Sequence, residues 1–91
     1  MNNNRILAVL EAYEKHFINK GAENIKADFD EIPTSHQETW NHLLSMIGEM
    51  KVFLKQNRRE KLFRWLDFMQ GVLWTTGEFT LNQFRRHNQA K

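Results

Sequence analysis

Basic side chains gather in the segment KQNRREKLFR, residues 55–64, and they are the side chains of this chain best suited to bind an anion. Arg58 and Arg59 are expected in the first turn of a helix, where free backbone N–H groups and the helix dipole attract negative charge. Arg64 adds a third guanidinium group, and Trp65 supplies a ring that stacks on a base or an arginine. The pattern predicts a site for a phosphate-bearing ligand, and a solvated basic turn is the alternative interpretation.

The sequence offers no arrangement of side chains typical of a catalytic or metal centre. It contains no cysteine, which excludes disulfide bonds and thiolate chemistry. Its four histidines lack the i, i+4 spacing of a metal site, and no nucleophile elbow or phosphate-binding glycine loop is present. We therefore expect a binding protein that is not an enzyme and that uses neither a metal nor a cofactor.

The net charge of +2 hides an uneven distribution along the chain. Residues 1–50 carry four Lys or Arg and eight Asp or Glu, a net charge of −4, whereas residues 51–91 carry nine and three, a net charge of +6. Opposite halves of this kind favour contact between two copies of the chain. Arg85, Arg86 and His87 are expected at the end of a helix, where cations are favourable in any case, so nucleic-acid binding is a weaker alternative.

Helices are expected to hold these side chains, because apolar residues recur at helical spacing in four stretches. The stretches cover about residues 4–19, 35–56 and 58–75, with a short fourth at 81–88. We predict an all-α fold, a small helical bundle with a central helical hairpin, forming one domain over residues 1–91. One unbroken helix from 35 to 75 is the alternative, because neither glycine nor proline interrupts residues 49–70.

Capping signals set the expected helix starts. The pairs with capping-box spacing are Thr34 with Gln37, Ser35 with Glu38, Asn57 with Glu60 and Thr80 with Gln83, while Asn3 or Asn4 is the expected first N-cap. Phe79 and Phe84 have the spacing of a hydrophobic staple around the last start. Between the first two helices, residues 21–33 form an acidic loop that we expect to be held at Ile25, Phe29 and Ile32.

The third helix carries more aromatic surface than one core needs. The core stripe expected for this helix is formed by Leu62, Trp65, Leu66, Met69, Val72 and Leu73. Phe63 and Trp74 lie about a third of a turn from this stripe, beside Gln70, and Phe68 lies on the other flank. Gly71 points away from the core, where a helical glycine costs about 1 kcal/mol relative to alanine unless something packs closely against it. We predict a homo-oligomer interface through Phe63, Phe68, Gln70 and Gly71, with Trp74 as a second stacking ring for the ligand. A docking surface for another protein is the alternative.

No apolar run is long enough to span a membrane, and the N-terminal residues lack the apolar core and cleavage site of a signal peptide. A cytosolic setting without membrane contact is therefore expected.

Residues 42–88 resemble a group of small proteins encoded by tailed bacteriophages, most specifically through RREK, RWL and FMQGVLW. That group has no assigned function and more often has glycine where Asp67 stands, so it contributes no functional residue. The RWL segment followed by Gln70 and Gly71 also resembles phage sponge proteins, which are oligomeric helical hairpins that sequester cyclic-nucleotide immune signals.

These resemblances imply a phage accessory protein in the host cytoplasm that counters host defence. It would act without catalysis, by forming a homo-oligomer that sequesters an anionic, nucleotide-type signalling ligand. The alternatives are an inhibitor that docks onto a host defence protein and a nucleic-acid-binding accessory protein.

Overall fold

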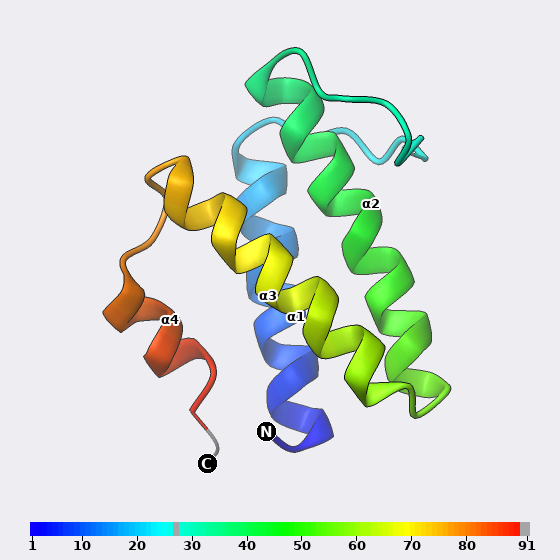
Figure 1. Cartoon of the computed structure of the whole chain (residues 1–91), viewed down its shortest axis with the longest axis vertical. Coiled ribbons are helices and arrows are strands. Elements are labelled where there is room, and N and C mark those ends of the chain that lie inside the picture. The colour runs from blue at the N-terminus through cyan, green and yellow to red at the C-terminus, as the bar shows by residue number, and fades with distance from the viewer. Residues whose placement is uncertain (27, 90–91) are drawn as a thin grey trace.

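The computed structural model describes residues 1–26 and 28–89, and it contains four helices and no strand in that part of the chain. They are α1 (Asn3–Asn19), α2 (His36–Lys55), α3 (Arg59–Thr75) and the short α4 (Leu81–His87). Figure 1 shows α1 and α2 running in opposite directions, with α3 returning across them. The predicted all-α bundle with a central hairpin is confirmed, and each predicted helix end lies within one residue of the observed one.

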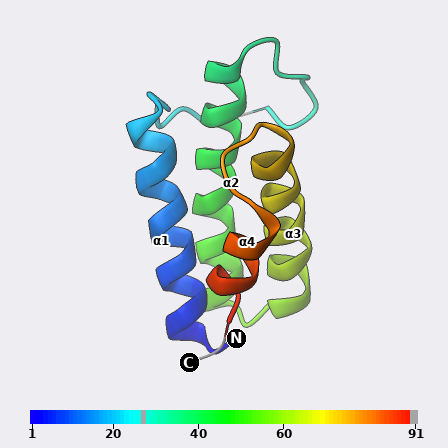
Figure 2. The same cartoon turned by 90° about the vertical axis from the view of Figure 1, so that its left-hand side faces the viewer.

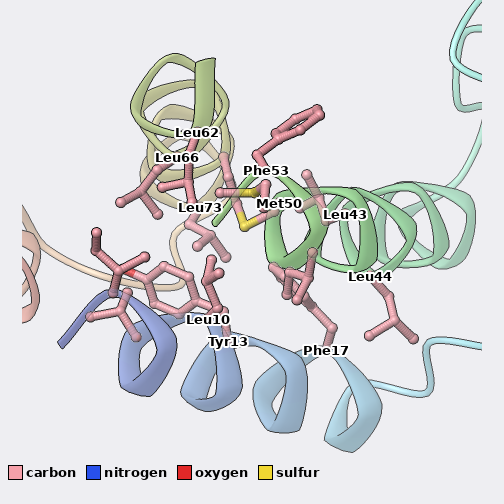
Figure 3. Packing of buried hydrophobic residues seen from close by; sticks show 14 of the residues in the cluster. Leu10, Tyr13, Phe17, Leu43, Leu44, Met50, Phe53, Leu62, Leu66 and Leu73 are labelled. Carbon is pink, nitrogen blue, oxygen red and sulfur yellow. The ribbon is translucent and has the colours of Figure 1, made fainter. Parts of the chain in front are cut away.

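One apolar core joins the three long helices. Figure 3 shows Leu10, Tyr13 and Phe17 pointing from α1 towards side chains of α2 and α3. The apolar residues that recur at helical spacing in the first helix, Ile6, Leu10, Tyr13 and Phe17, are fully buried, as are Leu62, Leu66, Met69 and Leu73 of α3. Trp65 and Val72, which were expected in the core, only pack against its edge.

The turn between α2 and α3 depends on Asn57. This residue has a φ of 57°, the left-handed conformation that asparagine tolerates better than most side chains. Arg58 N–H donates to the Phe53 carbonyl at 2.9 Å and Asn57 N–H donates to the Leu54 carbonyl at 3.1 Å, which is the Schellman pattern of a helix end. The capping pair of Asn57 with Glu60 is therefore wrong, because Asn57 ends α2 and Arg58 is the N-cap of α3.

The other helix starts follow the capping signals with small shifts in register. Ser35 Oγ accepts from Glu38 N–H, but the Glu38 carboxylate bonds to Thr34 rather than to Ser35. The expected cap at Asn3 or Asn4 is wrong by one residue or more, because the side chain of Asn2 caps α1 by accepting from Arg5 N–H. At α4 the predicted capping box of Thr80 and Gln83 is confirmed.

The loop between α1 and α2 is held less firmly than expected. Ile32 is 85% exposed and Ile25 is also largely exposed, so neither anchors the loop. Of the three apolar residues, Phe29 does contact the bundle, because its ring centroid lies 5.7 Å from that of Trp65. Hydrogen bonds instead attach the start of this loop, through Gln37 Nε2 to the Gly21 carbonyl and Glu23 N–H to Asn41.

Helix α4 packs beside α1 and α3, as Figure 2 shows. Phe84 is its one buried residue, and the centroids of the Phe79 and Phe84 rings lie 5.8 Å apart, as expected of the hydrophobic staple.

Within the described residues, none of the helices is long and apolar enough to cross a membrane.

Candidate ligand-binding sites

The three predicted arginines lie together around the start of α3. Arg58, Arg59 and Arg64, with Asn57, Glu60 and Lys61, line an open hollow of about 340 Å³, which we call the basic turn. No side chain caps this helix start, so the first N–H groups of α3 point to where an anion would be attracted by the helix dipole. Four cations face one carboxylate there, which makes the hollow electropositive.

Three of these cations lie over aromatic rings, and one of the three is also tied to the N-terminal segment. The Arg58 guanidinium carbon is 5.3 Å and Lys61 Nζ is 4.9 Å from the centroid of the Phe53 ring. Arg59 lies 5.4 Å from the centroid of the Phe63 ring and donates to Asn3 Oδ1 and to the Met1 carbonyl. Arg59 therefore already has a structural role, whereas Arg58 and Arg64 are both exposed.

The two predicted stacking tryptophans do not join the arginines. Trp65 is half-buried, with its ring centroid 4.9 Å from that of Phe53, and it lines a different groove. Trp74 is 54% exposed, but it lies ten residues after Arg64, which is about 15 Å along a helix. A ligand held by Arg58 and Arg64 therefore does not reach the ring of Trp74.

The four predicted interface residues divide into two groups. Phe68 is 60% exposed, and a Cβ added at the exposed Gly71 would meet no atom within 4 Å, so nothing in the described chain packs closely on that glycine. Phe63 packs against the core beneath Arg59. Gln70 is only 7% exposed, so its expected place on the outer face is wrong: α1 and the end of α4 cover it.

Gln70 belongs to a polar network that holds the end of α4. Its Nε2 donates to the Tyr13 hydroxyl at 3.1 Å and to Asn88 Oδ1 at 2.7 Å, and Asn88 Nδ2 donates back to Gln70 Oε1. The Tyr13 hydroxyl lies 2.7 Å from His87 Nδ1. Arg5 adds two bonds by donating to the carbonyls of Arg86 and His87.

Burial shifts the titration of this network. It raises the pKa of Tyr13 to about 12, although the hydrogen bond from Gln70 opposes the rise. Burial also lowers the pKa of His87, and the nearby positive charges of Arg5 and Arg86 lower it further. His87 is therefore neutral at pH 7, which suits an imidazole that accepts a hydrogen bond at Nδ1.

An ion pair fixes the connector between α3 and α4. Glu78 Oε1 lies 2.7 Å from His16 Nε2 and 3.0 Å from Lys20 Nζ. Burial acts to raise the pKa of Glu78, but the hydrogen bonds and charges of Lys20 and His16 outweigh it, so the pKa is lowered. The connector therefore lies against α1, and a groove of about 440 Å³ opens beside it.

A third hollow, the apolar groove, lies between the 28–33 loop, α2 and α3. It has a volume of about 380 Å³, and Phe29, Leu43, Met46, Trp65, Phe68 and Val72 form most of its wall. His42 and Thr39 supply its polar groups. Such a wall suits an apolar segment rather than an anion.

Neither the α4 network nor the 440 Å³ groove has a direct signal in the sequence. The one usable signal was Tyr13 on an apolar stripe, because a buried tyrosine hydroxyl requires a hydrogen-bond partner.

Among the described residues, no group of three His, Asp or Glu side chains is placed to hold a metal ion. The chain matches no protein-family model, no curated protein and no solved structure.

Proposed function

We propose that this protein binds a phosphate-bearing ligand at the basic turn and acts by sequestering it, without catalysis. The observation that carries the proposal is the gathering of Arg58, Arg59, Lys61 and Arg64 around a helix start that no side chain caps. A phosphate there gains both the free backbone donors and the guanidinium groups, whose paired N–H groups match its oxygens.

The proposed ligand is a nucleotide-type signal of a bacterial host, and the proposed setting is a phage accessory protein that counters host defence. This step rests on the resemblance of RREK, RWL and FMQGVLW to phage proteins. Because Trp65 and Trp74 lie away from the basic turn, recognition there rests on phosphate groups rather than on base stacking. The open shape of the hollow also favours a second copy of the chain that closes it over the ligand.

The first experiment is native mass spectrometry of the protein purified from bacterial cytoplasm. We expect a discrete oligomer that retains additional mass of nucleotide size. The double variant Arg58→Ala with Arg64→Ala should lose that mass. The matched control is Arg85→Ala with Arg86→Ala, which removes two exposed arginines from α4 and should retain it. A bare monomer, or equal loss in both double variants, would contradict the proposal.

The second candidate function is inhibition of a host defence protein by direct docking. The apolar groove favours it, because Phe68 stands 60% exposed at a wall built from Trp65, Val72 and Met46. Exposed aromatic residues beside a hollow are common anchors of protein interfaces. A bare monomer whose binding to a host protein is abolished by Phe68→Ala but not by Arg58→Ala with Arg64→Ala would support docking over sequestration.

A further inference from the structure

The groove between α1 and the connector to α4 has the composition of an anion site. Its lining includes Arg5, Lys15, His16, His87, Tyr13 and Phe79. Two permanent cations and two imidazoles therefore face it, and no carboxylate is among the lining residues. Its volume of about 440 Å³ lies within the range of small-molecule pockets, roughly 300–1,000 Å³. We call it the α1–α4 groove.

Aromatic rings form one side of this groove. The ring centroid of Phe79 lies 4.9 Å from that of His16, 5.0 Å from that of His87 and 5.9 Å from that of Tyr13. Ala8 and Ala12 of α1 also line the groove, and their small side chains leave room beside the rings. A flat ring is a good fit between aromatic side chains and a smooth apolar wall.

Arg5 and the two imidazoles of the groove are held in place before any ligand binds. Arg5 donates through Nε and one terminal nitrogen to the carbonyls of His87 and Arg86, at 3.0 and 2.8 Å, and its other terminal nitrogen has no hydrogen-bond acceptor in the described structure. His16 is held by Glu78 at 2.7 Å, and His87 by Tyr13 at 2.7 Å. Side chains fixed in this way lose little conformational freedom on binding, so more of the contact energy becomes affinity.

We propose that the α1–α4 groove binds a small phosphorylated molecule that carries a flat heterocyclic ring. Lys15 would contact the phosphate, and the ring would pack against Phe79. Arg5 lies ten residues before Lys15, about 15 Å along α1, and would face the other end of the ligand. This site is separate from the basic turn, because none of the residues that line the basic turn lines the groove. The inference therefore stands whether or not the basic turn binds a ligand.

The test is a two-dimensional 1H–15N NMR titration of the full chain with adenosine 5′-monophosphate. The expected result is a saturable shift of the amide signals of Ala8, Ala12 and Phe79. Inorganic phosphate and adenosine, which each offer half of the ligand, should bind at least about tenfold more weakly. Shifts confined to the amides of residues 59–61, or phosphate binding as tight as that of the nucleotide, would overturn the proposal.

Charge reversal at one lysine, with a matched control, links the binding to the groove. Lys15→Glu should weaken binding of the nucleotide by about tenfold or more, because a favourable charged contact is replaced by a repulsive one. Lys55→Glu changes the net charge equally, lies beside the basic turn and should change the affinity by less than about twofold. Equal weakening by the two variants would show binding by overall charge and would overturn the assignment.

A second variant tests the shape of the groove without changing its charge. Ala12 is exposed on α1, so Ala12→Leu is compatible with the helix and reduces the space beside Phe79. The variant should keep the thermal unfolding midpoint of the unmodified chain and lose the nucleotide-induced shifts. Unchanged affinity in a folded Ala12→Leu protein would place the ligand elsewhere.

Discussion

Removing one oxygen atom tests how α4 is held to the bundle. Tyr13 is 2% exposed, and its hydroxyl lies 3.1 Å from Gln70 Nε2 and 2.7 Å from His87 Nδ1. Tyr13→Phe keeps the ring in the core and deletes both hydrogen bonds. Gln70 keeps its bonds to Asn88, whereas His87 Nδ1 loses the only hydrogen-bond partner it has in the described structure.

The magnitude follows from the number and surroundings of the lost bonds. Each buried hydrogen bond contributes about 0.5–1.5 kcal/mol, so we expect Tyr13→Phe to lower the free energy of unfolding by about 1–2 kcal/mol. For a domain of this size, each kcal/mol corresponds to about 4–8 °C in the unfolding midpoint. The Tm should therefore fall by roughly 5–15 °C.

The assay is thermal and urea unfolding followed by circular dichroism, in a double-mutant cycle with His87→Ala. The two substitutions should be non-additive by about 0.5 kcal/mol or more, because they remove the same bond. A Tyr13→Phe protein as stable as the unmodified chain, or strict additivity in the cycle, would refute the view that this network attaches α4.

Three further predictions concern single residues. The pKa of His87 in the folded chain is lowered from its usual 6.5, so the unfolded chain binds more protons than the folded chain as the pH falls. The free energy of unfolding, measured by urea titration, should therefore decline from pH 7.5 to pH 5.5, and it should decline less in the His87→Ala variant. Gly71→Ala should raise the free energy of unfolding of the dilute protein by about 1 kcal/mol, measured by urea unfolding, because a Cβ there meets no atom. Asn57→Gly should keep the free energy of unfolding, because glycine tolerates the left-handed conformation, whereas Asn57→Val should lower the free energy of unfolding by about 1–2 kcal/mol. Equal stability of the two variants in thermal unfolding would contradict the turn geometry.

Much of the fold follows from local signals that a single sequence carries. The stripe of Ile6, Leu10, Tyr13 and Phe17 predicts which face of the first helix is buried, because residues three and four apart lie on one side of a helix. The capping box at Thr80 predicts where α4 begins, because its bonds form within one turn. Such features depend only on neighbours in sequence, and they were predicted correctly.

What surrounds a side chain at the edge of a helix's apolar stripe is not determined by its neighbours in sequence. Gln70 was expected on the outer face of α3, yet Tyr13 and Asn88, its partners, lie 57 and 18 positions away. Helical periodicity gives the direction of Gln70 but not which element lies there. The docking of α4 decides that, and its hydrogen bonds to Arg5, Tyr13 and Gln70 are spread over the chain.

The arginines show the same division between local and tertiary information. Arg58, Arg59 and Arg64 are close in sequence, so a helix start was enough to bring them together. Trp65 follows Arg64 directly, but consecutive residues on a helix point about 100° apart, so the ring lies in the apolar groove instead. Adjacency in sequence was therefore enough to predict that the arginines cluster, but not that the Trp65 ring lies in a different groove.

Charge counted along the chain also hides how charge is arranged in space. The first fifty residues have a net charge of −4, but Arg5 and Lys15 from this acidic half face a groove that has no carboxylate in its lining. The acidic side chains of that half lie elsewhere: Glu38 bonds to Thr34 at the start of α2, and Glu14 pairs with Lys51 at 3.0 Å. Cations of a net negative segment can thus line a groove that has no carboxylate in its lining, because partners such as Thr34 and Lys51 hold Glu38 and Glu14 elsewhere. For this reason the α1–α4 groove is a product of the tertiary fold, whereas the basic turn was already visible in the sequence.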